Sequence, residues 1–589
     1  MIYNAPIEDM LFLVDEWIGL DRIRQLRGHE ELDRDMVEAI LSEAEKFCVN
    51  ELLPINRDGD EIGAVLKDGV VITPPGFKDA YDRFVEGGWT GLDADPEHGG
   101  QGLPKLLQYL VEEMLAACNL SFKLYPELTR GAYHLIDAFA SDDIREHYLP
   151  KMVDGVWSGT MCLTEPHSGT DLGLLTTKAV AQENGAYEIT GSKIFITSGD
   201  HDLTENIIHM VLARIDGAPD GVRGISLFLV PKSKINDDGS LGESNQVTTG
   251  SIEHKMGISA SPTCALNFDG ATGYLIGEAN HGLNAMFKMM NMERITVGIQ
   301  GLGLADIAYQ NAVAYAHERL QSRAPGERPD PDEAADPIIY QPEIQRKLLR
   351  IRSQVEGARA LAVYTGFLVD VLGRTDDDQE RSEAEGSIAL LTPVVKSFLS
   401  DLGLNSTLAA QQVFGGHGYV REHGMEQLVR DARITQIYEG TNEVQAVDLL
   451  TRKLTADNGR IVGRQLEYWE GFFESQNQPD DILSSAESGL AHLIAATQSL
   501  QSLLDSDRAR ALGGATEYQR LFGLVIIGCI WADISVSITD KTGPFYDAKR
   551  KLARFYMDHV LPEAESLKKT IIVGADALAE FSAQDFAAL

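Results

Sequence analysis

The stretch "YEITGSKIFITS", residues 187–198, shows that this chain is not entirely helical. Apolar and β-branched residues recur along it with the short period of a half-buried β-strand. Similar runs, "IIHMVLARI", "GISLFLVP" and "ALNFDG", follow before residue 277, separated by turns rich in glycine, asparagine, aspartate and proline. Residues 159–277 are therefore predicted to form an antiparallel β domain.

Helical periodicity surrounds this β domain on both sides. Upstream, "ELDRDMVEAILSEAEKFCVNELL" repeats apolar residues at intervals of three and four. Downstream, the same pattern is long enough for a four-helix bundle, broken by acidic loops expected at 322–337 and 373–386, and then continues into an extra helical segment. The domains predicted for this α+β chain are an N-terminal helical domain with an extension (1–158), the β domain (159–277), the bundle (278–457) and an extra C-terminal helical domain (458–589).

Composition narrows the possible functions. The 589 residues carry a formal net charge of −38, which repels nucleic acids and anionic membranes at long range. No basic stretch precedes the apolar residues of the N-terminus, so no signal peptide is expected and the predicted location is the cytoplasm. The apolar run "LFGLVIIGCIWA", residues 521–532, is too short to cross a bilayer and predicts a buried helix. Five scattered cysteines have no metal-ligand spacing and are interpreted as buried thiols.

Two motifs of the β domain have residue types that suit a cofactor. The stretch "MCLTEPHSGTDLG", residues 161–173, places a loop rich in glycine, serine and threonine after a strand. Small residues let backbone N–H groups approach an anion closely, although an ordinary strand-to-loop turn has the same composition. Phe195 and Thr197 are expected on one face of the next strand, where an aromatic ring either covers a planar cofactor or packs in the core.

Glycines are dense in two helical motifs. In "QQVFGGHGYVREHG", residues 411–424, they indicate either a close approach by another group or a helix C-cap followed by a turn. His417 and His423 stand in the same stretch without a third ligand nearby, so no metal site is predicted. The motif "GIQGLGLADI", residues 298–307, follows a helical pattern rather than a strand, which favours helix packing over a dinucleotide fingerprint.

A single carboxylate stands out in "ITQIYEGTNEVQ", residues 434–445. Glu439 lies between a tyrosine and a Gly-Thr turn in an otherwise mostly uncharged run. Such a glutamate is either a solvated charge near a helix start or a base kept away from water. The turn alone leaves both alternatives open.

Five motifs in order resemble the acyl-CoA dehydrogenase family. They are "MCLTEPHSGTDLG", "ITGSKIFITSG", "ERITVGIQGLGLA", "QVFGGHGY" and "RDARITQIYEGTNEVQ", and the resemblance covers about residues 39–453. The opening "YNAPIEDMLFLVDEW" and the extra C-terminal segment further resemble the long bacterial subgroup that includes 3-methylmercaptopropionyl-CoA dehydrogenases. The resemblance implies FAD held between the β domain and the bundle, and oxidation of an acyl-CoA to its trans-2-enoyl-CoA.

The resemblance also assigns cofactor-binding residues. In the β domain, Thr164, Phe195 and Thr197 match positions at the flavin ring, with Phe195 replacing a common Trp. Arg319 matches a residue that reaches the FAD of a neighbouring subunit, although the Phe that usually follows is missing here. The other matching FAD positions are Gly169 and Thr170 near the phosphates, Gln412, Gly415 and Gly416 near the adenosine, and Thr441 and Glu443.

By the same resemblance, Glu439 matches the catalytic base. Its backbone N–H would also help to polarise the thioester oxygen, in the manner of an oxyanion hole, and Gly440 completes that turn. Some relatives take the base from the position of Glu293, beside Arg294, which matches a residue near the substrate. The sequence carries a carboxylate at both places, and Glu439 is the predicted base, with burial by substrate and flavin expected to raise its pKa.

The implied partners follow from the family as well. The expected substrate is 3-methylmercaptopropionyl-CoA or another short or medium acyl-CoA, and the expected electron acceptor is an electron-transfer flavoprotein. A homodimer is expected because Arg319 would complete a partner's site. An acyl-CoA oxidase, which gives electrons to oxygen, and a non-catalytic flavoprotein relative are the alternatives; the charge of −38 and the presence of Glu439 weigh against the second.

Overall fold

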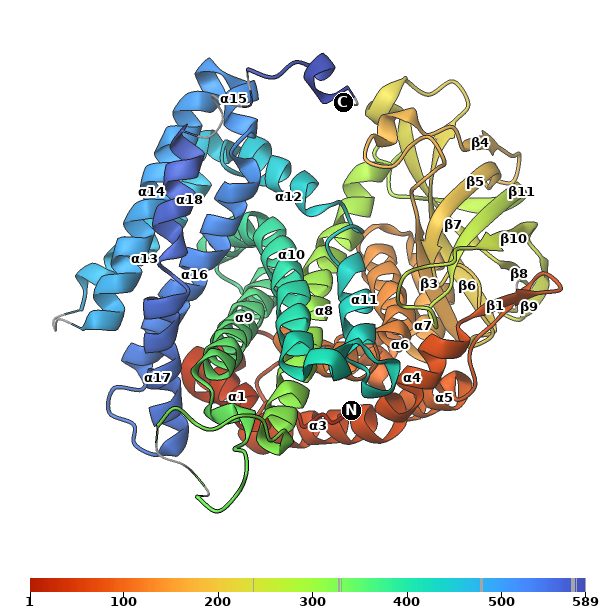
Figure 1. Cartoon of the computed structure of the whole chain (residues 1–589). Coiled ribbons are helices and arrows are strands. Elements are labelled where there is room, and N and C mark those ends of the chain that lie inside the picture. The colour runs from red at the N-terminus through yellow and green to blue at the C-terminus, as the bar shows by residue number, and fades with distance from the viewer. Residues whose placement is uncertain are drawn as a thin grey trace. The chain divides into compact units, whose positions relative to one another are not determined.

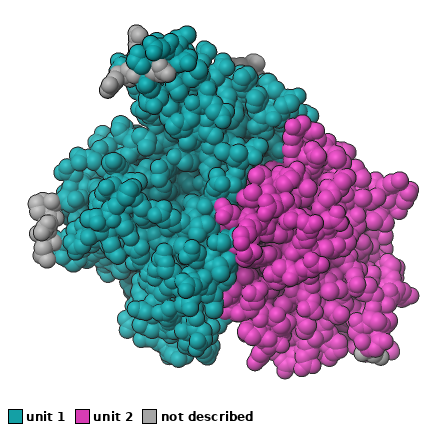
Figure 2. Space-filling view, turned by 90° about the horizontal axis from the view of Figure 1, so that it is seen from below, with its two compact units in different colours: residues 1–42, 104–113, 294–589 teal, residues 43–103, 114–293 magenta. Residues whose placement is uncertain are grey.

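The fold consists of two compact units, shown in teal and magenta in Figure 2. In this computed structural model, the structure describes residues 1–236, 238–326, 329, 331–476, 480–573, 578 and 580–587. We call the first unit, residues 1–42, 104–113 and 294–589, the helical unit, and the second, residues 43–103 and 114–293, the sheet unit. The four domain limits predicted from the sequence stay a prediction.

The sheet unit contains a seven-stranded sheet and several helices (Figure 1). Its helices are α4 (Leu53–Ile62), α5 (Phe77–Glu86), α7 (Asp142–Val153) and most of α6 (Lys105–Phe139). The strands of the main sheet are β3 (Trp157–Cys162), β4 (Lys178–Ala181), β5 (Tyr187–Thr197), β6 (Asn206–Ile215), β7 (Ile225–Pro231), β10 (Val247–Ile252) and β11 (Thr263–Ile276). Two small hairpins are formed by β1 (Val65–Lys67) with β2 (Val70–Ile72), and by β8 (Ser233–Ile235) with β9 (Leu241–Ser244).

The main sheet is mostly antiparallel, as predicted, but it includes two parallel pairings. β6 pairs in parallel with both β3 and β4, whereas β7 pairs antiparallel with β6 and β11. Since β11 also pairs with β5, and β5 with β4, the path β11–β5–β4–β6–β7 returns to β11. Such long-range pairings are not encoded in the local alternation of a strand, so the sequence pattern did not reveal them.

The apolar core of the sheet unit explains a methionine-rich run at the start of α8 (Gly282–Glu318). Met286 and Met289 are fully buried, and Met290 nearly so, in one cluster with side chains of α6, α7 and the sheet. These flexible side chains fill gaps in the core. These methionines therefore belong to the apolar core of the sheet unit.

The helical unit is built around long helices that pack closely. Its helices are α1 (Ile7–Leu11), α2 (Leu20–Arg24), most of α3 (Arg34–Phe47), the remainder of α8, α9 (Pro342–Arg374), α10 (Asp378–Phe414), α11 (Met425–Ile434), α12 (Asn442–Asp448), α13 (Arg460–Glu474), α14 (Asp481–Ser506), α15 (Arg508–Leu512), α16 (Ala515–Ser537), α17 (Pro544–His559) and α18 (Glu563–Val573). A Cβ added at Gly301 would lie 2.3 Å from the Leu399 carbonyl oxygen, and one at Gly403 would lie 2.6 Å from the Cα of Gly301. The prediction of helix packing through the glycines of α8 is confirmed.

The second predicted acidic loop, at 373–386, is largely helical. α9 continues to Arg374, and α10 begins at Asp378, because the Asp377 carboxylate accepts hydrogen bonds from the backbone N–H groups of Gln379 and Glu380 at 2.8 and 3.1 Å. This is a helix N-cap, which an acidic run supplies readily. The first predicted loop, at 322–337, falls partly outside the described residues.

The C-terminal helices pack within the helical unit, against α9 and α10. The Trp531 indole of α16 donates a hydrogen bond to the Ser353 carbonyl oxygen of α9 at 3.0 Å. Gln519 donates to the Pro393 carbonyl oxygen of α10 at 3.0 Å. The apolar run of α16 is almost completely buried, which confirms the predicted buried helix.

Two described helices are apolar and long enough to meet the criteria for a membrane span. They lie within 378–419 and 515–537, and 72% of each apolar window is buried inside the protein. Burial of this extent is typical of core helices, which meet the same criteria of length and hydropathy.

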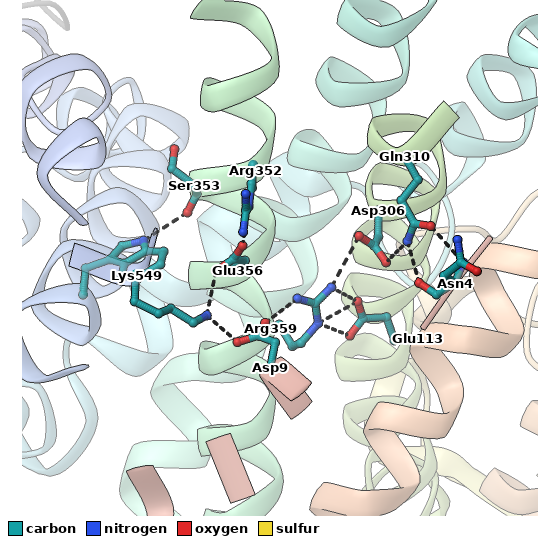
Figure 3. A network of polar contacts seen from close by, with 11 residues as sticks. Asn4, Asp9, Glu113, Asp306, Gln310, Arg352, Ser353, Glu356, Arg359 and Lys549 are labelled. Carbon is teal, nitrogen blue, oxygen red and sulfur yellow. Dashed lines mark hydrogen bonds and ion pairs between the residues drawn. The ribbon is translucent and has the colours of Figure 1, made fainter. Parts of the chain in front are cut away.

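A network of buried charges connects several elements of the helical unit, among them α1, α6, α9 and α17 (Figure 3). Arg359 of α9 donates to Glu113 of α6 and to Asp9 of α1, each at 2.6 Å. Lys549 of α17 donates to the same Asp9 and, at 2.6 Å, to Glu356 of α9. These ion pairs connect the N-terminal segment and the C-terminal helix α17 to α9. Removal of one partner from a buried ion pair is strongly destabilising, so the network stabilises this arrangement against separation.

All five cysteines are buried and unbridged, which confirms their interpretation as buried thiols. Burial raises the pKa of Cys162 and of Cys264 to about 12, so neither thiol is a ready nucleophile at neutral pH. In the part of the chain that the structure describes, no group of three or more His, Cys, Asp or Glu residues is placed to hold a metal ion.

Candidate active site

Glu439 lies in a tight turn between α11 and α12 of the helical unit. Its φ is 56° and that of the following Gly440 is 80°, so two consecutive residues adopt the left-handed conformation. This conformation is costly for a glutamate and is typical of functional turns. Thr441 then caps α12, its hydroxyl accepting the Val444 N–H at 3.3 Å, and the Gln445 side chain donates to the Glu439 carbonyl oxygen at 3.0 Å. The turn expected from the sequence is present, and the Glu439 side chain is half-buried.

A buried polar network lies beneath this turn. The Asn442 carboxamide accepts a hydrogen bond from the Lys396 ammonium at 2.8 Å and donates to Ser400 at 3.0 Å and to Asp401 at 2.8 Å. Gln436, on the other side of the turn, also donates to Asp401, at 2.6 Å. Both ends of the turn are thus fixed to α10 by side chains that the sequence motifs did not single out.

Two cations act electrostatically on Glu439. Burial lowers the pKa of Arg294, and the negative charges of Asp448 and Glu439 partly oppose that shift. Burial lowers the pKa of Lys396 to about 8, again opposed by Glu439. The side chain of Glu439 therefore lies in the field of two buried positive charges.

Glu293, the other candidate base, has a different environment. It is 4% exposed and belongs to the sheet unit, whereas Glu439 belongs to the helical unit. A Cβ added at Gly131 of α6 would lie 2.4 Å from a carboxylate oxygen of Glu293. The carboxylate of Glu293 therefore packs against the backbone of α6.

The glycine-rich loop after β3 presents small exposed residues. Gly169 and Thr170 are exposed, and a Cβ added at Gly169 would meet no atom of the described chain within 4 Å. The backbone at Thr164 is fixed, because its carbonyl oxygen accepts the Ile194 N–H at 2.9 Å. Packing inside the sheet unit therefore does not require a glycine at position 169.

Phe195 departs from the regular strand that the sequence predicted. Lys193 pairs with Leu266 and Ile196 with Cys264, so two residues of β5 stand opposite one residue of β11. The φ of Phe195 in this bulge is 58°, and its side chain is 59% exposed. Bulges redirect side chains and are common next to functional sites. Thr197, two residues further on, is half-buried.

The glycines after α10 serve two purposes. Gly415 ends the helix with a φ of 57°, which agrees with the C-cap alternative, and neither Gly415 nor Gly416 has an atom of the described chain near an added Cβ. A Cβ at Gly418, in contrast, would lie 2.4 Å from the Gln411 carbonyl oxygen. Gly418 is thus required by packing inside the helical unit, whereas the two preceding glycines face open space.

The remaining predicted cofactor residues of the helical unit are on its surface. Arg319 follows the end of α8 and is exposed, as are Gln412 and Glu443. A hydrogen bond from the Thr441 side chain lowers the pKa of Glu443. The structure thus brings Thr441, Glu443 and Glu439 together around one turn. The roles assigned to these residues stay predictions.

Family profiles match most of the chain. The N-terminal, middle and C-terminal domains of acyl-CoA dehydrogenases match residues 35–156, 160–271 and 280–454. A further domain, described as acetyl-CoA dehydrogenase C-terminal like, matches residues 470–582. The described helices and strands follow the same order, including the extra C-terminal helices.

Individual relatives agree with these profiles. The chain is 44% identical over 468 residues to a 3-methylmercaptopropionyl-CoA dehydrogenase of Ruegeria pomeroyi, with 79% of each chain covered. It is 33% identical to a butyryl-CoA dehydrogenase of Syntrophomonas wolfei, with 95% of each covered. A crystal structure of an acyl-CoA dehydrogenase from Bacillus anthracis complexed with FAD shares the fold, with a TM-score of 0.74 at 23% identity over 97% of this chain and 93% of that one. The chain belongs to the acyl-CoA dehydrogenase family and is an enzyme of that family.

Proposed function

We propose that this enzyme oxidises the α,β-bond of an acyl-CoA thioester to the trans-2-enoyl-CoA, with FAD as cofactor and Glu439 as the base. The observation that carries the proposal is the turn at Glu439. The backbone of Glu439 is in the left-handed conformation, and its carbonyl oxygen accepts a hydrogen bond from Gln445. The side chain of Glu439 lies in the electrostatic field of Lys396 and Arg294. A family member needs one carboxylate held in a defined place, and the fixed turn at Glu439 supports that role for this residue.

The chemistry assigns a distinct task to each group. The carboxylate of Glu439 takes the α-proton, and the electron pair of the broken α-carbon–hydrogen bond forms the new carbon–carbon double bond as hydride leaves the β-carbon. FAD, when bound, supplies the acceptor for that hydride at its N5 atom. The backbone N–H of Glu439 donates to the thioester oxygen, where negative charge develops as the proton departs. Gly440 lets the chain turn directly after the base without a side chain at that point.

The exposed residues suit FAD in size and chemistry. Phe195 presents an exposed aromatic ring on the sheet unit. Phe195, Thr164 and Thr197 would contact the flavin ring. Gly169 and Thr170 offer backbone N–H groups and a hydroxyl for the pyrophosphate. On the helical unit, the residues that would hold the cofactor are Arg319, Gln412, Gly415, Gly416, Thr441 and Glu443.

Glu439 is preferred over Glu293 because of their surroundings. The carboxylate of Glu293 packs closely against α6, where a Cβ added at Gly131 would lie 2.4 Å from one of its oxygens. Glu439 is half-buried at a turn whose following residue is a glycine. A base must reach the α-carbon of a bound substrate, and Glu439 is more accessible than Glu293. Glu293 and Arg294 are proposed to line the substrate site.

The proposed substrate is 3-methylmercaptopropionyl-CoA or another short or medium acyl-CoA. Support comes from the 44% identity to the Ruegeria pomeroyi enzyme and from the 33% identity to a butyryl-CoA dehydrogenase. We further propose an electron-transfer flavoprotein as electron acceptor, a homodimer as the assembly and the cytoplasm as the location. These three assignments rest on the family resemblance.

An anaerobic titration tests the proposal. Purified FAD-loaded enzyme is mixed with butyryl-, octanoyl-, palmitoyl- and 3-methylmercaptopropionyl-CoA, and the visible flavin band is followed. Bleaching is expected with each accepted thioester, fastest with 3-methylmercaptopropionyl-CoA or butyryl-CoA. A yellow enzyme that no thioester bleaches contradicts the proposal. In air, rapid peroxide formation without an added acceptor would indicate an oxidase instead.

A further inference from the structure

The carboxylate of Glu165 is buried in the loop after β3 and is surrounded by donors. It is 2% exposed. One of its oxygens accepts from the Thr176 N–H and hydroxyl at 2.7 and 2.9 Å, and the other from the Thr177 N–H and hydroxyl at 3.0 and 2.6 Å. Lys193 donates to the second oxygen at 2.8 Å. Five hydrogen bonds thus converge on one side chain that no step of the proposed reaction uses.

The pair of Glu165 with Lys193 is fully enclosed by the sheet unit. Lys193 is 0% exposed, and its ammonium also donates to the Leu163 carbonyl oxygen at 3.0 Å. Burial alone would raise the pKa of Glu165, but Lys193 and the threonine donors lower it to about 2. The carboxylate therefore stays ionised at neutral pH and keeps all five donors.

These contacts connect two segments that the proposed function places at the flavin. Because Glu165 lies near the start of the glycine-rich loop, and Thr176 and Thr177 follow its end, the carboxylate connects the two ends of the loop. Lys193 directly precedes the bulge, and the Ile194 N–H donates to the Thr164 carbonyl oxygen at 2.9 Å. Thr164 is adjacent to Glu165, and Phe195 is two residues from Lys193.

We propose that the Glu165–Lys193 pair is a positioning element that holds the glycine-rich loop and the Phe195 bulge in one fixed arrangement for the bound flavin. This inference rests on the proposed function, because it assumes that both segments contact FAD. Neither residue contacts the reacting atoms; each acts through its neighbours, Thr164 and Phe195. A buried ion pair suits this task, since loss of either partner leaves an uncompensated charge and disfavours alternative loop conformations.

The test compares three variants with the wild type, as apoprotein and with FAD. Glu165→Gln removes the charge but keeps the shape. Thr177→Val is milder, because it removes one hydroxyl donor from a fully buried side chain of similar size. Glu243→Gln is the matched control, since it removes the acid of an exposed pair in the same unit, 2.7 Å from Lys234.

Three readouts are measured: the dissociation constant of FAD from the apoprotein, the visible circular dichroism of the bound flavin, and amide hydrogen exchange of residues 163–178 and 192–198 in the apoprotein. We expect the FAD dissociation constant to rise at least tenfold in Glu165→Gln and several-fold in Thr177→Val, with an altered flavin dichroism and faster exchange in both segments. Glu243→Gln should match the wild type in all three.

The outcomes separate this inference from the proposed function. If the variants fold and bind FAD with wild-type affinity and dichroism, while only their thermal stability falls, the pair is structural and the inference is wrong. If Glu165→Gln does not fold, Thr177→Val decides by the same readouts. A wild-type protein that binds no FAD overturns the proposed function together with this inference, whereas tight wild-type binding that no variant alters overturns this inference alone.

Discussion

Two glutamates of this enzyme, Glu165 and Glu439, are held in opposite ways. Glu165 is 2% exposed and receives five hydrogen bonds on its carboxylate. Glu439 is half-buried, and the contacts that define its turn are made by its backbone and by the neighbouring residues Asn442 and Gln445. Glu165 is held through its carboxylate, and the turn of Glu439 is held through its main chain.

The difference distinguishes a carboxylate held as an anion inside the sheet unit from the carboxylate that we propose as the base. A carboxylate that accepts five hydrogen bonds is stabilised as an anion, and the pKa of about 2 makes Glu165 a very weak base at neutral pH. The turn of Glu439 is instead anchored at its backbone, where the Gln445 side chain donates to the Glu439 carbonyl oxygen. Lys396 and Arg294 interact electrostatically with Glu439.

The largest effect is expected for the stability of Glu165→Gln. A shift in pKa from 4.5 to about 2 corresponds to roughly 3 kcal/mol of stability at neutral pH. In the unfolded chain Glu165 takes up a proton at a higher pH than in the folded protein, so this stability is present above about pH 5 and is lost as the pH falls toward 2. Urea unfolding at several pH values should show that the difference between wild type and variant narrows on acidification. A difference that does not change with pH would contradict the assignment.

The next effect concerns the network beneath Glu439. Asn442→Ala removes the group that links the buried Lys396 to the partly buried Asp401, leaving both with fewer partners. We expect a loss of about 2 kcal/mol in the free energy of unfolding and about a tenfold lower kcat, because the turn is no longer fixed. Val447→Ala, an exposed change in the same helix, is the control. An unchanged kcat in a folded Asn442→Ala enzyme would show that the network does not position the base.

The third prediction addresses the charge that faces the base. Lys396 is protonated below about pH 8, and its positive charge favours the ionised form of Glu439. In Lys396→Met, the acidic limb of the profile of kcat/KM against pH should therefore move upward, by about one pH unit. The other charges facing this lysine, Asp401, Arg294 and Glu443, remain in place. In Lys396→Arg, which keeps the positive charge, the acidic limb should stay at the wild-type pH. The same shift of the limb in both variants would show that the charge of Lys396 does not cause it.

The smallest effect is expected at the helix cap after the turn. The Thr441 hydroxyl accepts the Val444 N–H at the start of α12. Thr441→Ala should lower the free energy of unfolding by about 1 kcal/mol, as measured by urea unfolding. Thr441→Ser, which keeps the hydroxyl, should restore most of that loss. If both variants unfold alike, the cap contributes nothing to the stability of this turn.

Much of the fold was predictable because it depends on local periodicity. The helical segments, the strands of residues 159–277 and the buried helix α16 follow from patterns of period 3.6 and 2. The helix contact at Gly301 was predictable because the glycines of residues 298–307 follow a helical pattern and not a strand. The turn at Glu439 was predictable because a glycine follows the glutamate.

The remaining features depend on contacts between distant residues. The parallel pairings of β6 and the bulge at Phe195 are set by partner strands, which the alternation of one strand does not specify. Lys193 and Lys396 each stand beside apolar residues in the sequence, which could have indicated that they are buried. Because lysines are rarely buried without a partner, each could also have predicted a buried polar partner. Their partners, Glu165 and Asn442, are 28 and 46 residues away along the chain.

The central claim is that Glu439 takes the α-proton, and the reductive half-reaction tests it most directly. Wild type, Glu439→Gln and Glu293→Gln are loaded with FAD and mixed anaerobically with the best thioester in a stopped-flow instrument. We expect Glu439→Gln to remain yellow and to lose at least a hundredfold in the rate of flavin bleaching, while Glu293→Gln bleaches within about tenfold of the wild type. Wild-type bleaching by Glu439→Gln, with loss in Glu293→Gln, would contradict the account and move the base to the sheet unit.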